Sequence, residues 1–215
     1  IKPMAERIAR VPLPTDEVYD NVERIYERLK GMKELLSDPQ HTSIRLVINP
    51  ERMVIKESQR ALTYLSLYGF PVDAVFANRL LPAGVDDTYL AGWRDIQAEH
   101  MKSAVACFSP IPIFEIPMFP REIGGLDFLA EAARGAFSGG DPTAVHYKEK
   151  VIEISKKGGA YRLSIHLPFA QKGNVDLWVK GDDLTIRVDQ VKRSIRLPRA
   201  LSGRTVLSAK LENGR

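Results

Sequence analysis

The stretch RLVINPERMVIKESQRALTYLSLYGFPVDAVFANRLLP, at Arg45–Pro82, decides the fold. Two short apolar runs, Ile44–Ile48 and Asp73–Ala77, have the length of buried strands. Between them the pattern predicts a helix that runs to about Tyr68, with Gly69 as its left-handed C-cap and a proline two residues further on. The stretch therefore predicts a strand, a helix and a second strand.

The same alternation continues beyond this stretch. A helix is predicted from about Thr88 to Val105, a third strand at Ile111–Ile116, and a helix from Gly124-Gly125 to about Phe137. This order predicts an α/β fold with a parallel sheet and helices on both faces. Ligands of such sheets bind at the carboxyl ends of the strands. Here those ends carry Asn49-Pro50, Asn78-Arg79 and Met118–Arg121.

A long amphipathic helix is predicted ahead of the first strand. Thr15 is a candidate N-cap, and Ser37-Asp38-Pro39 ends the pattern. Its apolar residues recur at alternating spacings of four and three, at Val18, Val22, Ile25, Leu29, Met32 and Leu36. We expect this stripe to pack as an ordinary helix face. A groove for apolar client proteins is the alternative.

The pattern changes after the linker Ser138–Pro142, where apolar and polar residues begin to alternate with a period of two. Strands are predicted at Tyr161–Leu167, Leu184–Val188, Val191–Leu197 and Val206–Leu211. Short strands at this spacing predict a small all-β sandwich from about residue 151, without helices. Its first strand should bury Tyr161, Leu163, Ile165 and Leu167. We expect two domains, residues 1–147 and 148–215.

Net charge divides the chain at the same place. The 215 residues carry a net charge of +4, but residues 1–150 hold 18 Lys and Arg against 21 Asp and Glu, whereas residues 151–215 hold 13 against 6. The second part therefore carries +7. A solvated basic surface is the preferred interpretation, and a patch that meets phosphates is the alternative.

Composition restricts the setting of the protein. A hydrophobic content of 44% with 27% charged residues is typical of a globular protein. No uncharged stretch approaches the roughly 18–20 residues of a membrane helix, and no signal peptide is visible. Cys107, the single cysteine, cannot form an internal disulfide or hold zinc alone. A cytoplasmic protein without a membrane span is predicted.

No residue pattern amounts to a catalytic centre. No glycine is followed by lysine, so a Walker A loop is absent from this sequence. The four histidines have no metal-ligand spacing, and no metal site is predicted. Asp86-Asp87 and Glu99-His100 are interpreted as loop and helix-surface residues. Asn78 is the exception, because its amide at a strand end can pair with a purine edge, although a turn residue is the alternative.

Two segments resemble the ArsA family of ATPases, the arsenical-pump ATPases and their relatives that target tail-anchored membrane proteins. The first is Arg45–Pro82, and the second is IPIFEIPMFPREIGGLDFL at Ile111–Leu129. Together they cover about half of the chain. The resemblance implies the C-terminal half of a P-loop NTPase sheet.

The second part resembles an α-crystallin, or small heat-shock protein, domain. Its elements are YRLSIHLPFA, VDLWVKGDDLTIRV, RSIRLPRAL and LSAKLENG, which begin at Tyr161, Val175, Arg193 and Leu207. Some bacterial ArsA-like proteins carry this domain after the ATPase, and the order here is the same.

The ArsA resemblance implies a dimeric ATPase that uses ATP and Mg²⁺. By resemblance, Asn78 and Arg79 belong to a motif whose asparagine contacts adenine, and Phe119, Pro120 and Arg121 belong to a segment that lines the adenine pocket. The phosphate loop and magnesium site of the family lie in its N-terminal half, so no catalytic residue is expected in this chain. Both ends of the chain are expected to be truncated.

The sequence also departs from the family pattern. Eukaryotic relatives carry a Cys-x-x-Cys zinc clasp after the asparagine motif, whereas Leu80–Met101 contains no cysteine. No zinc is therefore expected. Arsenite binding needs several thiolates, and Cys107 alone is present.

Two functions remain open at this stage. The first is an ATPase in which ATP binding and hydrolysis drive a conformational change in a homodimer for client-protein or anion handling, with a hydrophobic client protein or a membrane pump subunit as its partner. The second is an ATP-independent chaperone-like module that holds apolar clients with its sandwich or its amphipathic helix. Nucleic-acid binding is not expected, because the basic tail lacks interleaved stacking aromatics.

Overall fold

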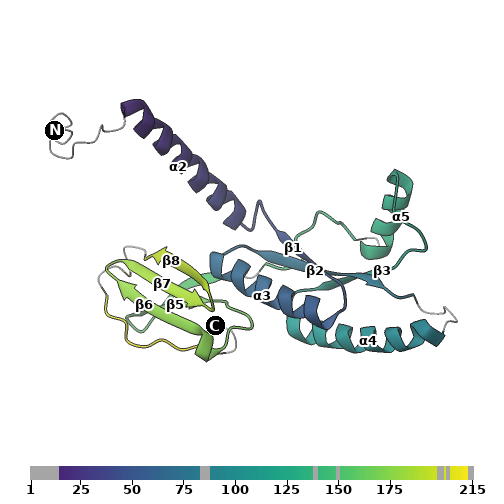
Figure 1. Ribbon diagram of the computed structural model, residues 1–215. Coiled ribbons are helices and arrows are strands. Elements are labelled where there is room, and N and C mark those ends of the chain that lie inside the picture. The colour runs from purple at the N-terminus through teal and green to yellow at the C-terminus, as the bar shows by residue number, and fades with distance from the viewer. Residues whose placement is uncertain are drawn as a thin grey trace, which may run out of the picture.

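The computed structural model describes residues 15–82, 88–137, 140–148, 151–197, 201 and 204–212. Over these residues the chain has the predicted mixed α/β fold. A parallel sheet with helices on both faces is followed by antiparallel strands that form a small sandwich (Figure 1).

Three strands form the parallel sheet. They are β1 (Ile44–Ile48), β2 (Val72–Leu80) and β3 (Ile113–Pro117), in the order β1-β2-β3 with both pairings parallel. The three predicted strands are confirmed. The central strand β2 runs three residues further than predicted, and its register with β3 shifts between Ala77 and Leu80. This irregularity lies at the Asn78-Arg79 pair.

Helices cover both faces of the sheet. Alternate residues of each strand point to opposite faces, so each face has its own side chains to pack against a helix. The helices α3 (Arg52–Tyr68) and α4 (Thr88–Phe108) cover the face that carries Val75 and Ala77. The helix α5 (Leu126–Phe137) covers the other face. There Phe137 lies with its ring centroid 5.5 Å from that of Phe76 and 5.4 Å from that of Phe114.

The C-terminus of α3 is capped as predicted. Gly69 has φ +80°, a left-handed conformation that glycine adopts without strain. Its N–H donates to the Ser66 carbonyl at 2.9 Å, and the Phe70 N–H donates to the Leu65 carbonyl at 2.9 Å. These two hydrogen bonds end the helix, and the chain then turns into β2.

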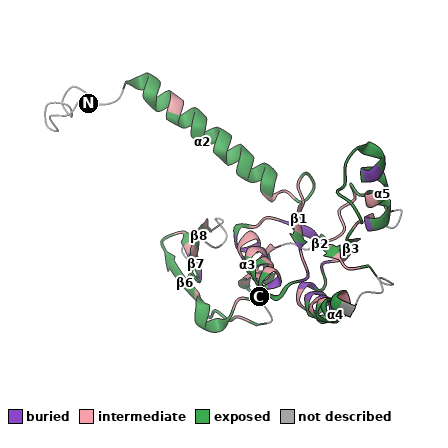
Figure 2. Cartoon of the chain, turned by 45° about the vertical axis from the view of Figure 1, so that its right-hand side comes forward, coloured by how far each residue is buried: buried purple, intermediate pink, exposed green. Residues whose placement is uncertain are grey.

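The first described helix, α2 (Asp16–Ser37), projects away from the rest of the molecule (Figures 1 and 2). Thr15 is its N-cap, as predicted, but the Thr15 side chain makes no capping bond. No residue of α2 is buried, and its apolar stripe is 41–59% exposed. Within the described residues the stripe therefore has no packing partner, and both interpretations of it stay open.

A buried ion pair fastens the linker to the sheet. Asp73, at the start of β2, is 0% exposed, and Arg45 of β1 donates to its carboxylate at 3.3 and 3.5 Å. Arg45 also donates to the carbonyls of Pro142 and Ala144, and the His146 N–H donates to Asp73 at 3.2 Å. The segment after α5 is thus held against the start of the sheet.

The second part is built from two antiparallel sheets. One pairs β4 (Ile152–Lys157) with β5 (Ala160–Ile165), and the other has the order β6 (Val175–Lys180), β7 (Asp183–Val188), β8 (Val191–Arg196). Leu167 is buried, Ile165 packs against the same core, and Tyr161 and Leu163 are half-buried.

Two details of the predicted sandwich are wrong. The predicted strand Val206–Leu211 is not a strand, because the described residues 204–212 pair with no other strand. A short 3₁₀ helix, η1 (Lys172–Asn174), lies where no helix was predicted. The Asn213-Gly214 pair lies outside the described residues.

Replacing Arg45 with Met should destabilise the protein by about 3–5 kcal/mol, because the fully buried Asp73 carboxylate loses its charged partner and is left with the His146 N–H bond. The control Arg60→Met removes the cation from the exposed Glu57–Arg60 pair and should change stability by less than about 1 kcal/mol. Urea unfolding of both variants measures the difference. Equal effects would contradict the structural role of the buried pair.

Candidate functional site

Asn78 lies at the carboxyl end of the central strand. The preceding residue, Ala77, is paired with Ile48 of β1 and with Glu115 of β3. The ends of the three strands therefore meet at one edge of the sheet, as predicted for a ligand site. Asn78 is half-buried, and no hydrogen bond engages its side-chain amide in the described part of the chain.

Arg79 has a backbone conformation that is uncommon for a residue with a side chain. Its φ is +59°, and its side chain is exposed. Gln97 of α4 holds the backbone around it, because the Gln97 side chain donates to the Arg79 carbonyl at 3.1 Å and accepts from the Leu81 N–H at 2.7 Å. Strained residues of this kind are frequent at functional sites.

Sequence reasoning missed Gln97. Its position on α4 carries no local signal, because a glutamine on a helix surface is ordinary. Only the tertiary structure shows that this side chain satisfies both a donor and an acceptor of the strand exit.

The segment after β3 reaches the same edge. The Met118 N–H donates to the Leu80 carbonyl at 2.7 Å, which ties this segment to the end of β2. The side chains of Phe119 and Arg121 both contact Phe128 of α5. Phe119 meets the Phe128 ring edge-on, with 5.2 Å between the centroids, and the Arg121 guanidinium lies 4.9 Å from the centroid of the same ring. Pro120 is exposed.

The structure thus brings the five predicted residues to one edge but in two groups. Asn78 and Arg79 belong to β2, whereas Phe119, Pro120 and Arg121 are fixed through Phe128. Asp86-Asp87, in the loop that follows β2, lies outside the described residues. Glu99, predicted to be a helix-surface residue, is exposed and pairs with Lys102 at 3.0 Å.

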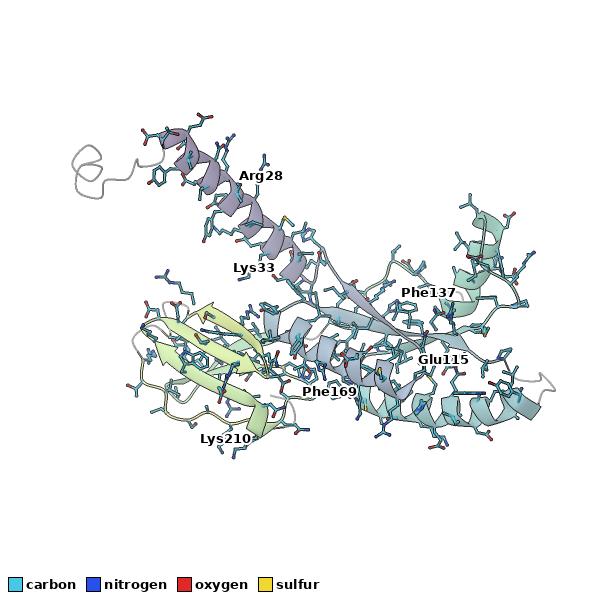
Figure 3. The ribbon with its side chains drawn as sticks, viewed as in Figure 1. Arg28, Lys33, Glu115, Phe137, Phe169 and Lys210 are labelled. Carbon is cyan, nitrogen blue, oxygen red and sulfur yellow. The ribbon has the colours of Figure 1, made fainter. Side chains whose placement is uncertain are left out.

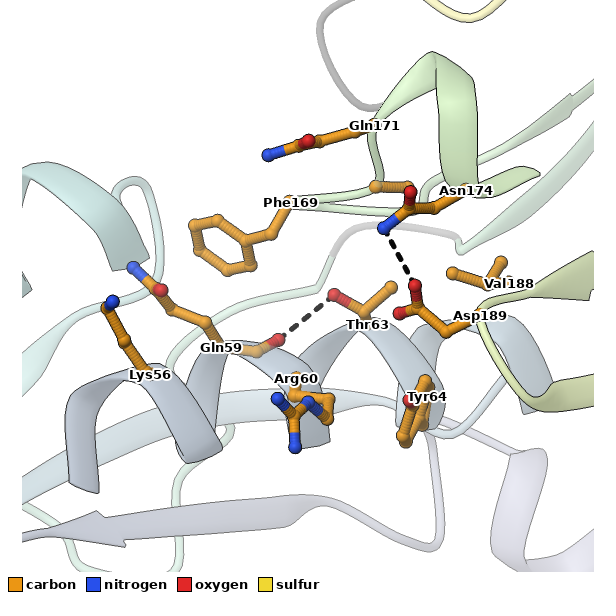
Figure 4. Close-up of a pocket in the computed structure, with 11 residues that line it drawn as sticks. Lys56, Gln59, Arg60, Thr63, Tyr64, Phe169, Gln171, Asn174, Val188 and Asp189 are labelled. Atoms are coloured by element: carbon orange, nitrogen blue, oxygen red, sulfur yellow. Dashed lines mark hydrogen bonds between the residues drawn. The ribbon is translucent and has the colours of Figure 1, made fainter. Parts of the chain in front are cut away.

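A second feature is a cleft of about 150 Å³ between α3 and the sandwich (Figure 4). It is lined by Lys56, Gln59 and Arg60 of α3 and by Phe169, Asn174 and Asp189 of the sandwich. The Asn174 side chain donates to Asp189 at 2.7 Å. Phe169 and Asp189 both have left-handed φ values, +65° and +51°. This cleft lies at the seam between the two parts of the chain.

The described residues hold neither a metal-ligand cluster nor a membrane-spanning helix. They contain no group of three or more His, Cys, Asp or Glu side chains placed to hold a metal ion. None of the described helices is both long enough and apolar enough to cross a membrane.

Comparison with known proteins agrees with this architecture. Residues 1–135 match the anion-transporting ATPase family, and residues 158–215 match the HSP20-like domain found in ArsA proteins. An ATPase-type α/β sheet followed by an HSP20-like sandwich is therefore the class that fold and sequence define. The chain belongs to the anion-transporting ATPase (ArsA) family.

Individual relatives are similar over most of the chain. A putative arsenical pump-driving ATPase 1 of Aquifex aeolicus is 38% identical over 98% of this chain and 54% of its own length. A putative arsenical pump-driving ATPase of Chlorobaculum tepidum is 36% identical over 93% of this chain and 49% of its own. The ATPase GET3B of Arabidopsis thaliana is 27% identical over 51% of this chain and 28% of its own. The chain spans about half the length of the first two relatives.

We expect Gln97→Leu to destabilise the protein by about 1–3 kcal/mol, because the Arg79 carbonyl and the Leu81 N–H both lose their partner. The exposed Glu99→Gln substitution on the same helix should stay within about 0.5 kcal/mol. Thermal unfolding measures both, and hydrogen exchange at Leu81 should rise in the first variant alone. Unchanged exchange at Leu81 would show that Gln97 does not hold the strand exit.

Proposed function

We propose that the intact protein is an ATP hydrolase and that this chain supplies the part that senses the nucleotide base and couples it to the second domain. The observation that carries the proposal is the half-buried Asn78 amide at the carboxyl end of the central strand, which has no hydrogen-bond partner among the described residues, in a chain of an ATPase family. An amide offers a donor and an acceptor, which complements the edge of adenine.

The roles proposed for the five site residues follow the geometry. Asn78 pairs with the base. The left-handed backbone conformation of Arg79, the next residue, directs the chain out of the strand. Phe119, Pro120 and Arg121 form the opposite wall, which Phe128 stiffens. Phe119 and Arg121 make these contacts without a bound nucleotide, and side chains already held in place lose less entropy on binding.

The remaining proposals concern the intact protein. Phosphoryl transfer needs a loop and a metal ion that hold the phosphates, and in our proposal these groups, with Mg²⁺, lie outside this chain. We propose a cytoplasmic homodimer without zinc, two domains that divide at residues 147 and 148, and a hydrophobic client protein or a membrane pump subunit as the partner.

A second candidate function is an ATP-independent chaperone-like module. The observation that favours it is the apolar stripe of α2, which is exposed along its length in the described structure. Exposed apolar faces of this size mark interaction sites. The two candidates are compatible, and nucleotide binding by the intact protein distinguishes the first from the second.

Replacing Asn78 with Ala in the intact protein should weaken ATP binding by about 1–3 kcal/mol, because the base edge loses its partner. The preference for ATP over GTP should fall with it. Competition binding with both nucleotides measures this, and Asn21→Ala on α2 is the matched control that removes an amide remote from the sheet edge. An unchanged ATP-to-GTP affinity ratio, with stability lowered, would make Asn78 a turn residue.

The purified 215-residue chain should not hydrolyse ATP by itself, because it encodes no Walker A loop. A phosphate-release assay with Mg²⁺ measures turnover, with the intact protein as the positive control. Turnover by the chain that is removed by a substitution within it would contradict the prediction.

A further inference from the structure

The helix α3 contributes to two hydrophobic cores. Leu62 is buried in the core between α3, α4 and the sheet. Leu67, five residues further on, is 0% exposed and lies in one apolar cluster with Leu167, Ile186 and Val188 of the sandwich. The core of the sandwich is therefore completed by a side chain of α3, a helix that packs on the parallel sheet.

A sandwich arginine also caps the helix. The last carbonyls of a helix lack intrahelical partners, and those of Leu65 and Ser66 are taken by the amides of Phe70 and Gly69. The Leu67 carbonyl is bonded instead by the Arg193 guanidinium of β8. A cation at this position also complements the negative end of the helix dipole.

The Arg193 guanidinium lies close to the glycine that ends α3. Arg193 is half-buried against the helix end, and this burial lowers the pKa of its guanidinium from the ordinary value. A Cβ at residue 69 would come within 3.3 Å of the Arg193 guanidinium, and Gly69 leaves that space free. The arginine thus meets the backbone of the helix end rather than a carboxylate.

Three further contacts lie along the same seam. The Thr63 hydroxyl, 4% exposed, donates to the Pro168 carbonyl, and the Tyr68 hydroxyl donates to the Lys192 carbonyl at 3.2 Å. Phe169 reaches from the sandwich to α4, where it meets Phe108 edge-on at 6.1 Å (Figure 3). The cleft of Figure 4 opens beside Thr63, so on α3 itself the close contact lies in the last turns of the helix.

We propose that the face of the sandwich formed by Arg193 and by the apolar cluster of Leu167, Ile186 and Val188 is a binding surface for the C-terminal turn of an amphipathic helix. The helix α3 occupies this surface. Leu67 fills the sandwich core, Arg193 binds the helix carboxyl end, and Gly69 leaves room for the guanidinium. Two consequences follow: the sandwich and the sheet move as one body, and this face is closed to other ligands while α3 is docked. The proposal is independent of ATP hydrolysis.

The connection between the two parts allows a direct test. The chain up to His146 is held on the sheet by Arg45 and Asp73. A protease site inserted between Glu149 and Lys150 therefore cuts the tether after this anchor and before the sandwich. After cutting, the noncovalent contacts of the sandwich with α3, together with the contact between Phe169 and Phe108 of α4, hold the two pieces together.

The experiment compares four variants of the cut full-length chain with the cut wild type. Arg193→Met and Leu67→Ala remove the two main contacts. Arg187→Met is the control for the first, because Arg187 lies on the same sheet and pairs with Asp176. Leu62→Ala is the control for the second, because it makes the same truncation on the same helix in the other core. Size-exclusion chromatography at serial dilutions gives the dissociation constant of the pieces.

We expect the wild type and both controls to keep the pieces together, and both test variants to raise the dissociation constant at least tenfold. Release of the sandwich by the cut wild type would overturn the proposal, and so would equal effects of Arg193→Met and Arg187→Met.

Hydrogen exchange on the uncut chains is the second measurement, and it tests the proposal even if a variant unfolds after cutting. The Gly69 and Phe70 amides should lose protection in both test variants, while the amides of Val75 and Ala77 in β2 stay protected. Protection at Gly69 and Phe70 that equals the wild type would also overturn the proposal.

Discussion

The helix α3 must satisfy two hydrophobic cores at once, and most of the structure depends on this constraint. Its Leu62 packs on the parallel sheet and its Leu67 packs in the sandwich. Because the helix is rigid, these two contacts fix the distance and orientation between the parts. The apolar cluster of the sandwich has four buried members, and one of them comes from α3. A core this small should lose stability when the helix is removed.

The sequence predicts those features of the fold whose causes are local. The strand Ile44–Ile48, the left-handed Gly69 and the parallel order of the sheet all follow from apolar runs and turn residues close in sequence. The predicted strand Val206–Leu211 failed because a strand needs a partner, and pairing is not local. The alternation of apolar residues there is real, but alternation alone supplies no hydrogen bonds.

The candidate site shows the same division between local and non-local causes. The position of Asn78 at a strand end follows from the sequence, whereas the contacts that hold that strand end do not. Gln97 bonds the backbone across 16 and 18 residues of sequence, and Arg193 reaches the Leu67 carbonyl across 126. Neither residue type marks such a role, since both are ordinary on a protein surface. The residues that position a site are therefore harder to predict than those at its edge.

The basic character of the sandwich also has a structural reason. Several of its cations are engaged within the chain, by a carboxylate, by a helix end or by an aromatic ring. These are Arg187 on Asp176, Arg193 on the Leu67 carbonyl, Lys192 over Trp178, and both Lys156 and Arg204 over Tyr161. Their partners lie on β5, β6 and α3, which differs from the row of free cations expected of a surface that follows a phosphate backbone. The charge of the sandwich thus fits a domain that docks on its own chain better than one that binds a polyanion.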